Sequence, residues 1–388
     1  MSLKFPLSSR KLRLGFVGGG EGALIGEVHA NGARLSNRWE IVSGALSSDA
    51  KRAELSGKAW GLSVDRTYTD FREMAESEAA RDDGIDAVAI VTPNHTHAEI
   101  ALAFMDAGIH VICDKPLATS LVDAKALVTK QAKTGLVLGV TYAYASHPMI
   151  RQAKAMVSRG QIGEVRQVHV EYFQEWAMDL TDQAGEIPWR LDSEKNGGLF
   201  TVADIGTHAE HLATYVSGLE LKALRAEFHT TGQPKALEDT AFMSLRFSKG
   251  AIGSLMVSQC FPGSHCGLRI RVVGTKATLD WHQETPEHLQ YLRVGAPAQT
   301  LSRGHSAGIH VEAERFVRMP RGHPEALTDA WANLYTEFGL GIGAKVGAVD
   351  VSSDLLDYPD INHGLRGVRF CEAAKQSNAS GHWVELDS

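Results

Sequence analysis

The sequence predicts two domains: an α/β domain with a parallel sheet, then an α+β domain whose open sheet is mostly antiparallel. Three observations lead to this fold class. Strand and helix signals alternate over residues 1–145, runs of strands with short turns dominate residues 146–388, and 388 residues is a typical length for two domains. We therefore place the domain boundary at residue 145.

The first domain is predicted from short apolar runs separated by amphipathic segments. The run at 85–91 is nearly all apolar, as expected for a parallel strand covered on both faces. The expected strands are 12–17, 40–46, 64–68, 85–91, 110–113 and 136–142. The expected helices are 23–35, 50–60, 97–107 and 120–134.

The second domain shows alternating apolar and polar residues in its strands, which is typical of a half-exposed sheet. Ser248-Lys249-Gly250 predicts a hairpin turn, so neighbouring strands are expected to be antiparallel. The expected strands are 165–173, 221–228, 240–247, 251–258, 268–273, 277–281 and 383–385. The expected helices are 149–158, 202–215, 325–338 and 364–376.

Composition and charge exclude several classes of function. The net charge of −7 gives no overall attraction to nucleic acid or to anionic membranes, and no apolar run is long enough for a transmembrane helix. The four cysteines form no C-x-x-C pair, which is typical of a cytoplasmic protein. Cys260, His265 and Cys266 fit no standard zinc spacing, so we expect no metal.

A glycine-rich turn follows the first expected strand and opens the first helix. Residues 18–23 read Gly-Gly-Gly-Glu-Gly-Ala, which fits G-x-G-x-x-G/A. In this motif Gly18 permits the tight turn, Gly20 lets the backbone approach a pyrophosphate, and Ala23 lets helix and strand pack closely. The sequence therefore predicts a dinucleotide-binding Rossmann domain; the alternative is a tight turn without a ligand.

The end of the second strand distinguishes NAD from NADP. An acidic residue there would bind the ribose 2′-hydroxyl of NAD, but Ser47 and Ser48 occupy that place and Arg52 follows. Hydroxyls and a guanidinium suit a 2′-phosphate, so we favour NADP(H) over NAD. Two alternatives remain: Asp49 binds the ribose after a shift of register, or the serines cap the following helix.

Three residues carry candidate chemistry. Lys115 stands before Pro116 at the carboxyl end of an expected parallel strand, where ligands bind, and that peptide bond can be cis. Asp204 and His208 are four apart and so share one face of a helix. A carboxylate can orient an imidazole, which can exchange a proton with a hydroxyl. Taken singly, each residue also fits a structural role.

Taken together and in order, these segments resemble the Gfo/Idh/MocA oxidoreductases, which include glucose–fructose oxidoreductase and inositol dehydrogenases. The resemblance covers nearly the whole chain. The matching segments are the glycine turn at 18–23, Thr92-Pro93-Asn94 with His97, Asp114-Lys115-Pro116, Gly197-Gly198, and Asp204 with His208.

The resemblance implies an NAD(P)-dependent dehydrogenase that moves a hydride between nicotinamide and a secondary alcohol of a sugar, polyol or cyclitol. It implies that Lys115 contacts substrate and nicotinamide, and that Asp204 and the acid–base His208 act together. It places the cofactor against Thr92, Asn94, His97, Asp114 and Tyr142, and the substrate against Trp189 and Arg190 as well as Lys115 and His208. Homodimers or homotetramers built on the open sheet face are also implied.

The chain departs from the family pattern at four places. Asp114 replaces a Glu, His211 stands where many relatives have an Asp, and the segment 142–148 lacks the Arg-rich pattern of many relatives. The glycine turn also runs on as Leu24-Ile25-Gly26. The substrate contacts are therefore not expected to be those of a standard inositol dehydrogenase. Alternatives are a dihydrodiol-type or other carbonyl reductase, a non-catalytic NAD(P)-binding regulator on the same fold, and a sugar-binding protein without a cofactor.

Overall fold

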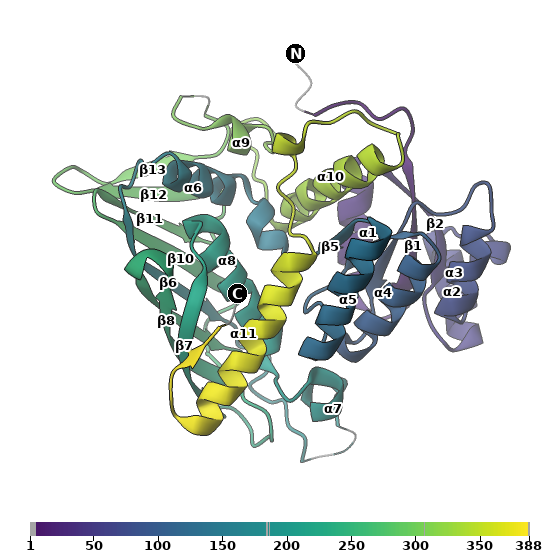
Figure 1. Cartoon of the computed structure of the whole chain (residues 1–388), viewed down its shortest axis with the longest axis horizontal. Helices are drawn as coiled ribbons and strands as arrows, with labels where there is room; N and C mark the ends of the chain where they lie inside the picture. The colour runs from purple at the N-terminus through teal and green to yellow at the C-terminus, as the bar shows by residue number, and fades with distance from the viewer. Residues whose placement is uncertain (1–4, 184, 186, 306, 387–388) are drawn as a thin grey trace. The chain divides into compact units, whose positions relative to one another are not determined.

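The computed structural model describes residues 5–183, 185, 187–305 and 307–386, and its chain divides into two compact units (Figure 1). Unit 1 consists of Met1–Ala143 and Leu327–Leu365, and unit 2 of Tyr144–Ala326 and Arg366–Ser388. The first division falls close to the expected boundary at residue 145. The return of residues 327–365 to unit 1 was not expected, because we had assigned all of 146–388 to the second domain.

Unit 1 contains a five-stranded parallel sheet in the order β2-β1-β3-β4-β5, as predicted. All five residues of β3 are buried, in agreement with its apolar sequence. The carboxyl ends of β1, β3 and β4 lead into the glycine turn, Thr92 and Asp114. The strands are β1 Leu12–Gly18, β2 Trp39–Ala45, β3 Ala87–Val91, β4 His110–Cys113 and β5 Leu138–Val140.

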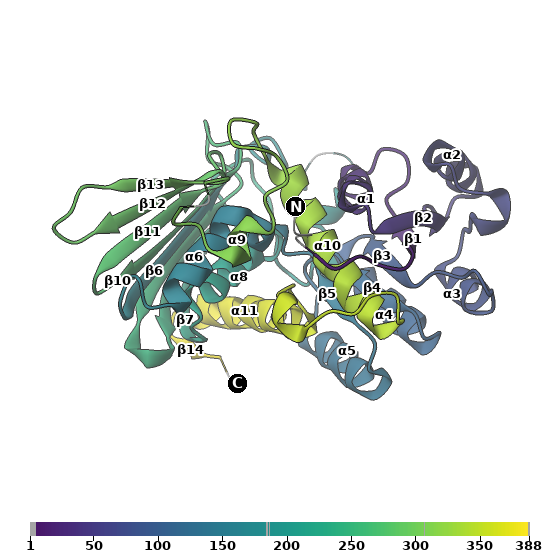
Figure 2. The same cartoon turned by 90° about the horizontal axis from the view of Figure 1, so that it is seen from above.

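Helices cover both faces of this sheet. Figure 2 shows α1 and α10 on one face and α4 and α5 on the other. Gly32 lets α1 and α10 approach, because a Cβ there would lie 3.0 Å from the Cβ of Trp331. The helices of unit 1 are α1 Leu24–Ser36, α2 Ala50–Trp60, α3 Phe71–Ala79, α4 His97–Asp106, α5 Leu121–Thr134 and α10 Leu327–Lys345, with 3₁₀ turns at Val64–Arg66, Asn94–Thr96 and Ser353–Leu355.

The strand expected at 64–68 is wrong. Val64–Arg66 forms a 3₁₀ turn, and Thr67 alone makes a bridge to Gly44 of β2. Val64 is 89% exposed, so no apolar burial supports a strand there, and Arg66 turns inward to donate from Nε to Glu78 Oε1 at 3.0 Å. Leaving the buried Arg66 charge without a carboxylate would cost more free energy than the strand hydrogen bonds would gain.

Unit 2 contains a nine-stranded sheet in the order β13-β12-β11-β10-β6-β9-β8-β7-β14. Neighbouring described strands are antiparallel except β6 and β9, which confirms the mostly antiparallel prediction. Strands β12 and β13 were not predicted. The strands are β6 Val165–Phe173, β7 Leu221–His229, β8 Thr240–Phe247, β9 Ile252–Ser258, β10 Gly267–Gly274, β11 Ala277–His282, β12 His288–Arg293, β13 Gln299–Ser302 and β14 Val384–Glu385.

Helices α6 and α8 pack on one face of this sheet, while side chains on the other face, such as Gln167 and Ser254, are exposed. The division between the units falls inside α11. The α-helices here are α6 Pro148–Ser158, α7 Ser193–Asn196, α8 Thr207–Ser217, α9 Val311–Glu314 and α11 Ile361–Ser380. A π-helix spans Val202–Gly206, and 3₁₀ turns span Ala143–Ser146, Trp189–Leu191 and Ser248–Gly250.

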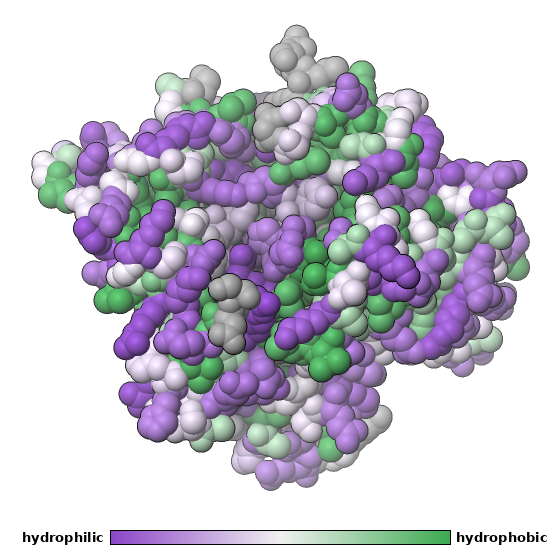
Figure 3. All heavy atoms as spheres, viewed as in Figure 1, coloured by the Kyte–Doolittle hydropathy of each residue, from purple (hydrophilic) through white to green (hydrophobic). Residues whose placement is uncertain are grey.

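Across the described residues, no helix is both long and apolar enough to cross a membrane. On the face seen in Figure 3, hydrophilic side chains are spread widely among small apolar patches.

Phe338 tests whether α10 belongs to the folding core of unit 1. It is fully buried, its ring occupies the space beside Gly139 of β5, and it packs edge-on against Tyr335 and Tyr358. We expect Phe338→Ala to lower the free energy of unfolding by about 3–5 kcal/mol, measured by urea denaturation. Val122→Ala, at a side chain of α5 that is 78% exposed, should change it by less than about 0.5 kcal/mol. Equal losses in the two variants would contradict this role.

Candidate active site

The glycine turn of unit 1 brings backbone segments unusually close together. Gly18 and Gly19 have φ values of +82° and +77°, which strongly favour glycine. A Cβ at Gly20 would lie 2.6 Å from the carbonyl oxygen of Leu46, and a Cβ at Gly19 would lie 2.8 Å from the Cα of Gly26. Gly26 therefore provides the close contact between helix and turn that we had assigned to Ala23.

Ala23 instead stands at the N-cap of α1, where its side chain makes no capping hydrogen bond. The first backbone N–H groups of a helix need partners from outside the helix, and they attract anions. An uncapped helix start beside glycines without Cβ atoms fits a dinucleotide pyrophosphate. The residues present therefore suit the predicted cofactor.

The segment after β2 joins the glycine turn through Arg52. Its Nη2 donates to the carbonyl oxygen of Glu21 at 2.8 Å. Asp49 caps α2 by accepting from the Arg52 backbone N–H at 2.8 Å, so the alternative in which serines cap this helix is wrong. Ser47 Oγ accepts from the Asp49 N–H at 3.2 Å, and Ser48 is exposed.

His97 connects two loops at the carboxyl ends of β3 and β4. Its side chain is fully buried, with Nδ1 2.8 Å from the Pro116 carbonyl oxygen and Nε2 2.9 Å from that of Thr92. Burial lowers the pKa of His97, which favours the neutral ring at neutral pH, and a neutral ring donates to one of these two carbonyl oxygens and packs against the other. The Lys115-Pro116 peptide bond is cis. His97 thus holds the backbone on either side of the predicted cofactor loop.

Asp114 is held ionised beside Lys115. Its Oδ1 accepts from Thr141 Oγ1 at 2.6 Å and lies 3.5 Å from His29 Nε2. Burial by itself would raise the pKa of Asp114, but His29, the Lys115 charge and the Thr141 hydroxyl lower it well below its usual range. Tyr142, next to Thr141, is 1% exposed.

In unit 2, the segment that carries Asp204 and His208 begins with a π-helix. The sequence predicted one regular helix over 202–215, but Val202–Gly206 is a π-turn and α8 begins at Thr207. The N–H of Thr207 donates to the carbonyl oxygen of Val202, five residues earlier. Such π-turns are frequent at functional sites. Asp204 lies within this turn and His208 in the first turn of α8.

Polar and aromatic side chains of unit 2 surround this pair. Gln259 Nε2 donates to Asp204 Oδ2 at 2.7 Å, and the Tyr144 ring meets the His208 ring edge-on, with centroids 4.9 Å apart. The hydroxyls of Tyr144 and Tyr172 are 2.5 Å apart. Burial raises the pKa of both tyrosines well above the ordinary value, so both remain protonated.

Two adjacent buried carboxylates, Glu238 and Asp239, support the start of the π-turn. Glu238 accepts from the backbone N–H of Phe200 at 3.0 Å and of Val202 at 2.9 Å. Neither Glu238 nor Asp239 belongs to a recognised motif, so sequence reasoning missed both. The only signal was an acidic pair placed directly before a strand.

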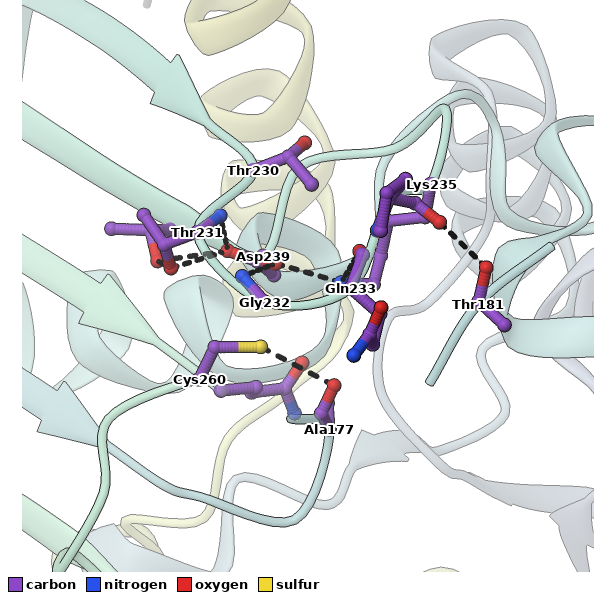
Figure 4. A network of polar contacts seen from close by, with 12 residues as sticks. Ala177, Thr181, Thr230, Thr231, Gly232, Gln233, Lys235, Asp239 and Cys260 are labelled. Atoms are coloured by element: carbon purple, nitrogen blue, oxygen red, sulfur yellow. Dashed lines mark hydrogen bonds and ion pairs between the residues drawn. The ribbon is translucent and has the colours of Figure 1, made fainter. Parts of the chain in front are cut away.

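Asp239 fixes the loop that presents Glu238. Figure 4 shows Asp239 among the backbone of Thr231 and Gly232 and the side chain of Lys235. Its carboxylate accepts from these groups at 2.8, 2.9 and 2.8 Å, and the Lys235 and Asp239 side chains are both 0% exposed. Burial would raise the pKa of Asp239, but these donors lower it well below its usual range.

The remaining predicted residues of unit 2 lie on short segments. Trp189 and Arg190 form a 3₁₀ turn in which the Arg190 guanidinium lies 4.5 Å from the centre of the Trp189 ring. His211 is 1% exposed and stacks on Tyr215, so it lies inside the helix packing.

Within the described ranges, no group of three His, Cys, Asp or Glu side chains is arranged to hold a metal ion. Cys260 Sγ faces the Ala177 carbonyl oxygen at 3.3 Å, whereas Cys266 Sγ lies 3.4 Å from the Tyr172 hydroxyl.

The fold thus collects the predicted residues into two groups. Unit 1 brings together the glycine turn, Arg52, Thr92, His97, Asp114 and Lys115 at the carboxyl ends of its strands. Unit 2 holds Asp204 and His208 on one short helical segment.

Comparison with known proteins covers both units. Two models of the GFO_IDH_MocA oxidoreductase family match this chain. The model of the NAD-binding Rossmann fold matches residues 12–142, and the model of the C-terminal alpha/beta domain matches residues 154–386. A crystal structure of an oxidoreductase from Sinorhizobium meliloti is 41% identical, covers 97% of this chain and 99% of its own, and has a TM-score of 0.88.

An inositol dehydrogenase homolog from Azotobacter vinelandii in complex with NAD+ is 36% identical, covers 99% of this chain and 100% of its own, and has a TM-score of 0.93. The structure of the homolog with NADH and myo-inositol is 35% identical, covers 98% of this chain and 99% of its own, and has a TM-score of 0.90.

Glu238 makes the stability of unit 2 depend on pH. Burial raises the pKa of Glu238 from 4.5 to about 7, despite the backbone N–H donors. Between these values the folded chain holds a proton that the unfolded chain has lost, so wild-type stability falls as pH rises. Glu238→Gln keeps an acceptor oxygen and does not titrate. We expect the unfolding free energy of the variant, relative to wild type, to rise from about pH 5 to about pH 8.

Urea denaturation at the two pH values measures this difference. Glu227→Gln, at an exposed side chain of β7, is the control for removing one acidic group. If the difference between Glu238→Gln and wild type is the same at both pH values, Glu238 does not titrate as described.

Proposed function

Because the chain belongs to the Gfo/Idh/MocA oxidoreductase family, we propose that it is an NAD(P)-dependent dehydrogenase of a secondary alcohol in a sugar, polyol or cyclitol. One observation carries the proposal: the same chain has a turn that fits a pyrophosphate and an intact set of Lys115, Asp204 and His208. The relative that binds NADH and myo-inositol supports this substrate class.

In this proposal unit 1 holds the cofactor. Gly18, Gly20 and the first amides of α1 bind the pyrophosphate, and the nicotinamide half lies against Thr92, Asn94, Asp114 and Tyr142. His97 positions these loops, since its fully buried ring lies against the carbonyl oxygens of Pro116 and Thr92. When bound, the nicotinamide supplies the hydride acceptor or donor.

The side chains of the chain supply proton transfer and charge stabilisation. A ring nitrogen of His208 takes the proton from the substrate hydroxyl or returns it, and the Asp204 carboxylate stabilises the imidazolium that forms. Lys115 Nζ donates to the reacting oxygen and stabilises the negative charge that develops on it. Trp189 and Arg190 border the substrate.

We further propose a cytoplasmic homodimer or homotetramer that assembles through the exposed face of the unit 2 sheet. Phe242 and Ile252, on β8 and β9, are 44% and 57% exposed, and a second copy would cover them. A small polar substrate and a copy of the chain are the partners in this proposal, without nucleic acid or a membrane.

His208→Ala tests the acid–base role. We expect kcat to fall by about 10²–10⁴-fold, because a positioned general base contributes on that order, while the Kd for NADH stays unchanged. Wild type and variant are assayed with a panel of sugars, cyclitols and diols, and NADH binding is measured by fluorescence.

His288→Ala, at an exposed histidine of β12, is the matched control and should keep wild-type turnover. Near-normal turnover in His208→Ala would contradict the acid–base role. Turnover of diols alone would favour a dihydrodiol dehydrogenase, and NADH binding without any turnover in the wild type would favour a regulator.

For cofactor choice we propose NADP(H), supported by Arg52 beside the glycine turn and by Asp49 being used as a helix cap. Arg52→Ala should weaken NADPH binding by about 10- to 100-fold, as expected for a charged hydrogen bond to a 2′-phosphate, and leave NADH binding nearly unchanged. Calorimetric titration of both cofactors measures the two effects.

Lys58→Ala, in the last turn of the same helix, is the control for the loss of one positive charge. The Azotobacter relative forms complexes with NAD+ and NADH, so the experiment must also measure whether this chain prefers NADH to NADPH. Wild-type binding of NADH in preference to NADPH, or an equal loss of both in Arg52→Ala, would overturn the proposal.

A further inference from the structure

Gln259 is a buried residue outside every motif described above, yet it contacts the predicted catalytic segment. It follows the last residue of β9, and its side chain is 0% exposed. Gln259 Oε1 accepts from Thr201 Oγ1 at 2.8 Å, and Nε2 donates to Asp204 Oδ2 at 2.7 Å and to Gln174 Oε1 at 3.2 Å. All of these residues belong to unit 2.

The chemistry of the neighbours determines which way the amide points. The indole N–H of Trp176 can only donate, and it lies 3.0 Å from Gln174 Oε1, so that atom is an oxygen. The atom of Gln259 that faces this oxygen must then be its nitrogen. The same nitrogen faces the Asp204 carboxylate, so both N–H groups of Gln259 have acceptors.

The backbone of Gln259 is fixed as well. Its N–H donates to the Asp239 carbonyl oxygen at 2.9 Å, and its own carbonyl oxygen accepts from the Ala177 N–H at 3.1 Å. The buried ion pair of Asp239 with Lys235 anchors this part of the chain (Figure 4). Gln259 therefore meets Asp204 from a rigid support.

The same network extends toward His208. Gln174 Nε2 donates to the Tyr172 hydroxyl at 3.3 Å, and Tyr172 shares a short hydrogen bond with Tyr144. The Tyr144 ring packs edge-on against His208. A chain of uncharged groups thus starts at one member of the predicted catalytic pair and ends beside the other.

We propose that Gln259 is a positioning residue: it holds the Asp204 carboxylate in the orientation required by the Asp204–His208 pair, and Gln174 links it to the tyrosines beside His208. This inference rests on the proposed dehydrogenase function. An amide suits the task because it donates to a carboxylate at every pH, which a carboxylic acid in its place does only while protonated.

Gln259→Glu tests the inference with a nearly isosteric change. At low pH the protonated Glu can still donate to Asp204, but at high pH two ionised carboxylates meet and repel each other. We expect the ratio of wild-type to variant kcat to be within a few-fold at about pH 5.5 and to reach about 10- to 100-fold at about pH 9. KM and the Kd for NADH should change little.

Several titratable groups near the site are present in both proteins, so their effects on kcat largely cancel in the ratio of wild-type to variant kcat. These groups are His208, Tyr144, Tyr172, Cys266 and the Glu238–Asp239 pair. Gln376→Glu, at an exposed side chain of α11, is the matched control and should show a ratio near one at every pH. A ratio for Gln259→Glu that does not rise with pH overturns the inference.

A second readout needs no turnover. The stability loss of Gln259→Glu should grow as pH rises above about 4.3, the ordinary Glu pKa, because the folded state resists ionising a second carboxylate. In an Asp204→Asn background this growth should become clearly smaller, since only burial and no longer the Asp204 charge opposes ionisation of the new carboxyl. If the growth is undiminished there, Gln259 does not act on Asp204 and the inference fails.

The two experiments separate the failure of the inference from that of the proposed function. If the wild type turns over no member of the substrate panel, the dehydrogenase function is overturned, and the hydrogen bond from Gln259 to Asp204 has no role in catalysis. A wild type that is active, with a ratio that is independent of pH, overturns the positioning role alone.

Discussion

Glu238 and Asp239 are adjacent carboxylates that are withdrawn from water, and a buried carboxylate must find donors or give up its charge. Asp239 finds Lys235 and two backbone N–H groups, and this closes the loop that precedes β8. Glu238 accepts from the N–H groups of Phe200 and Val202, and burial still raises its pKa to about 7, so it keeps its charge only in part at neutral pH. The first backbone N–H group of the π-turn with Asp204 is therefore held by Glu238.

In unit 1 the functional loops are held mainly by close backbone packing and by hydrogen bonds to backbone and hydroxyl groups. Gly19 and Gly26 approach so closely that a Cβ on either would collide with the other, and this keeps the start of α1 beside the turn. His97 and Asp114 then tie the neighbouring loops through carbonyl and hydroxyl groups. In both units buried polar contacts hold the functional loops.

The sequence predicted what short-range patterns encode. Apolar runs and glycines located β4, α2 and β8 at their observed bounds, and the motif spacing placed Lys115 and His208 on the segments where they are found. The π-turn was missed because no local pattern marks it, and Glu238, which accepts from the Val202 N–H, is distant in sequence. Residues 327–365 were expected to pack with the second domain, but a helical pattern does not say which elements it covers, and α10 packs on α1. Strand β13 is too polar to be detected by periodicity.

The same reasoning explains why Gln259 escaped notice although it touches Asp204. A motif identifies groups that react, and their spacing along the chain is set by one local element. Groups that orient them come from elsewhere, here from the end of β9, and need only the right donors in the right place. An amide meets that need without adding a charge, so the Asp204 carboxylate has a donor and no second titrating acid on this hydrogen bond. With neutral amides and protonated tyrosines around the pair, the proposed proton exchange belongs to the imidazole, the group whose ordinary pKa lies closest to neutral pH.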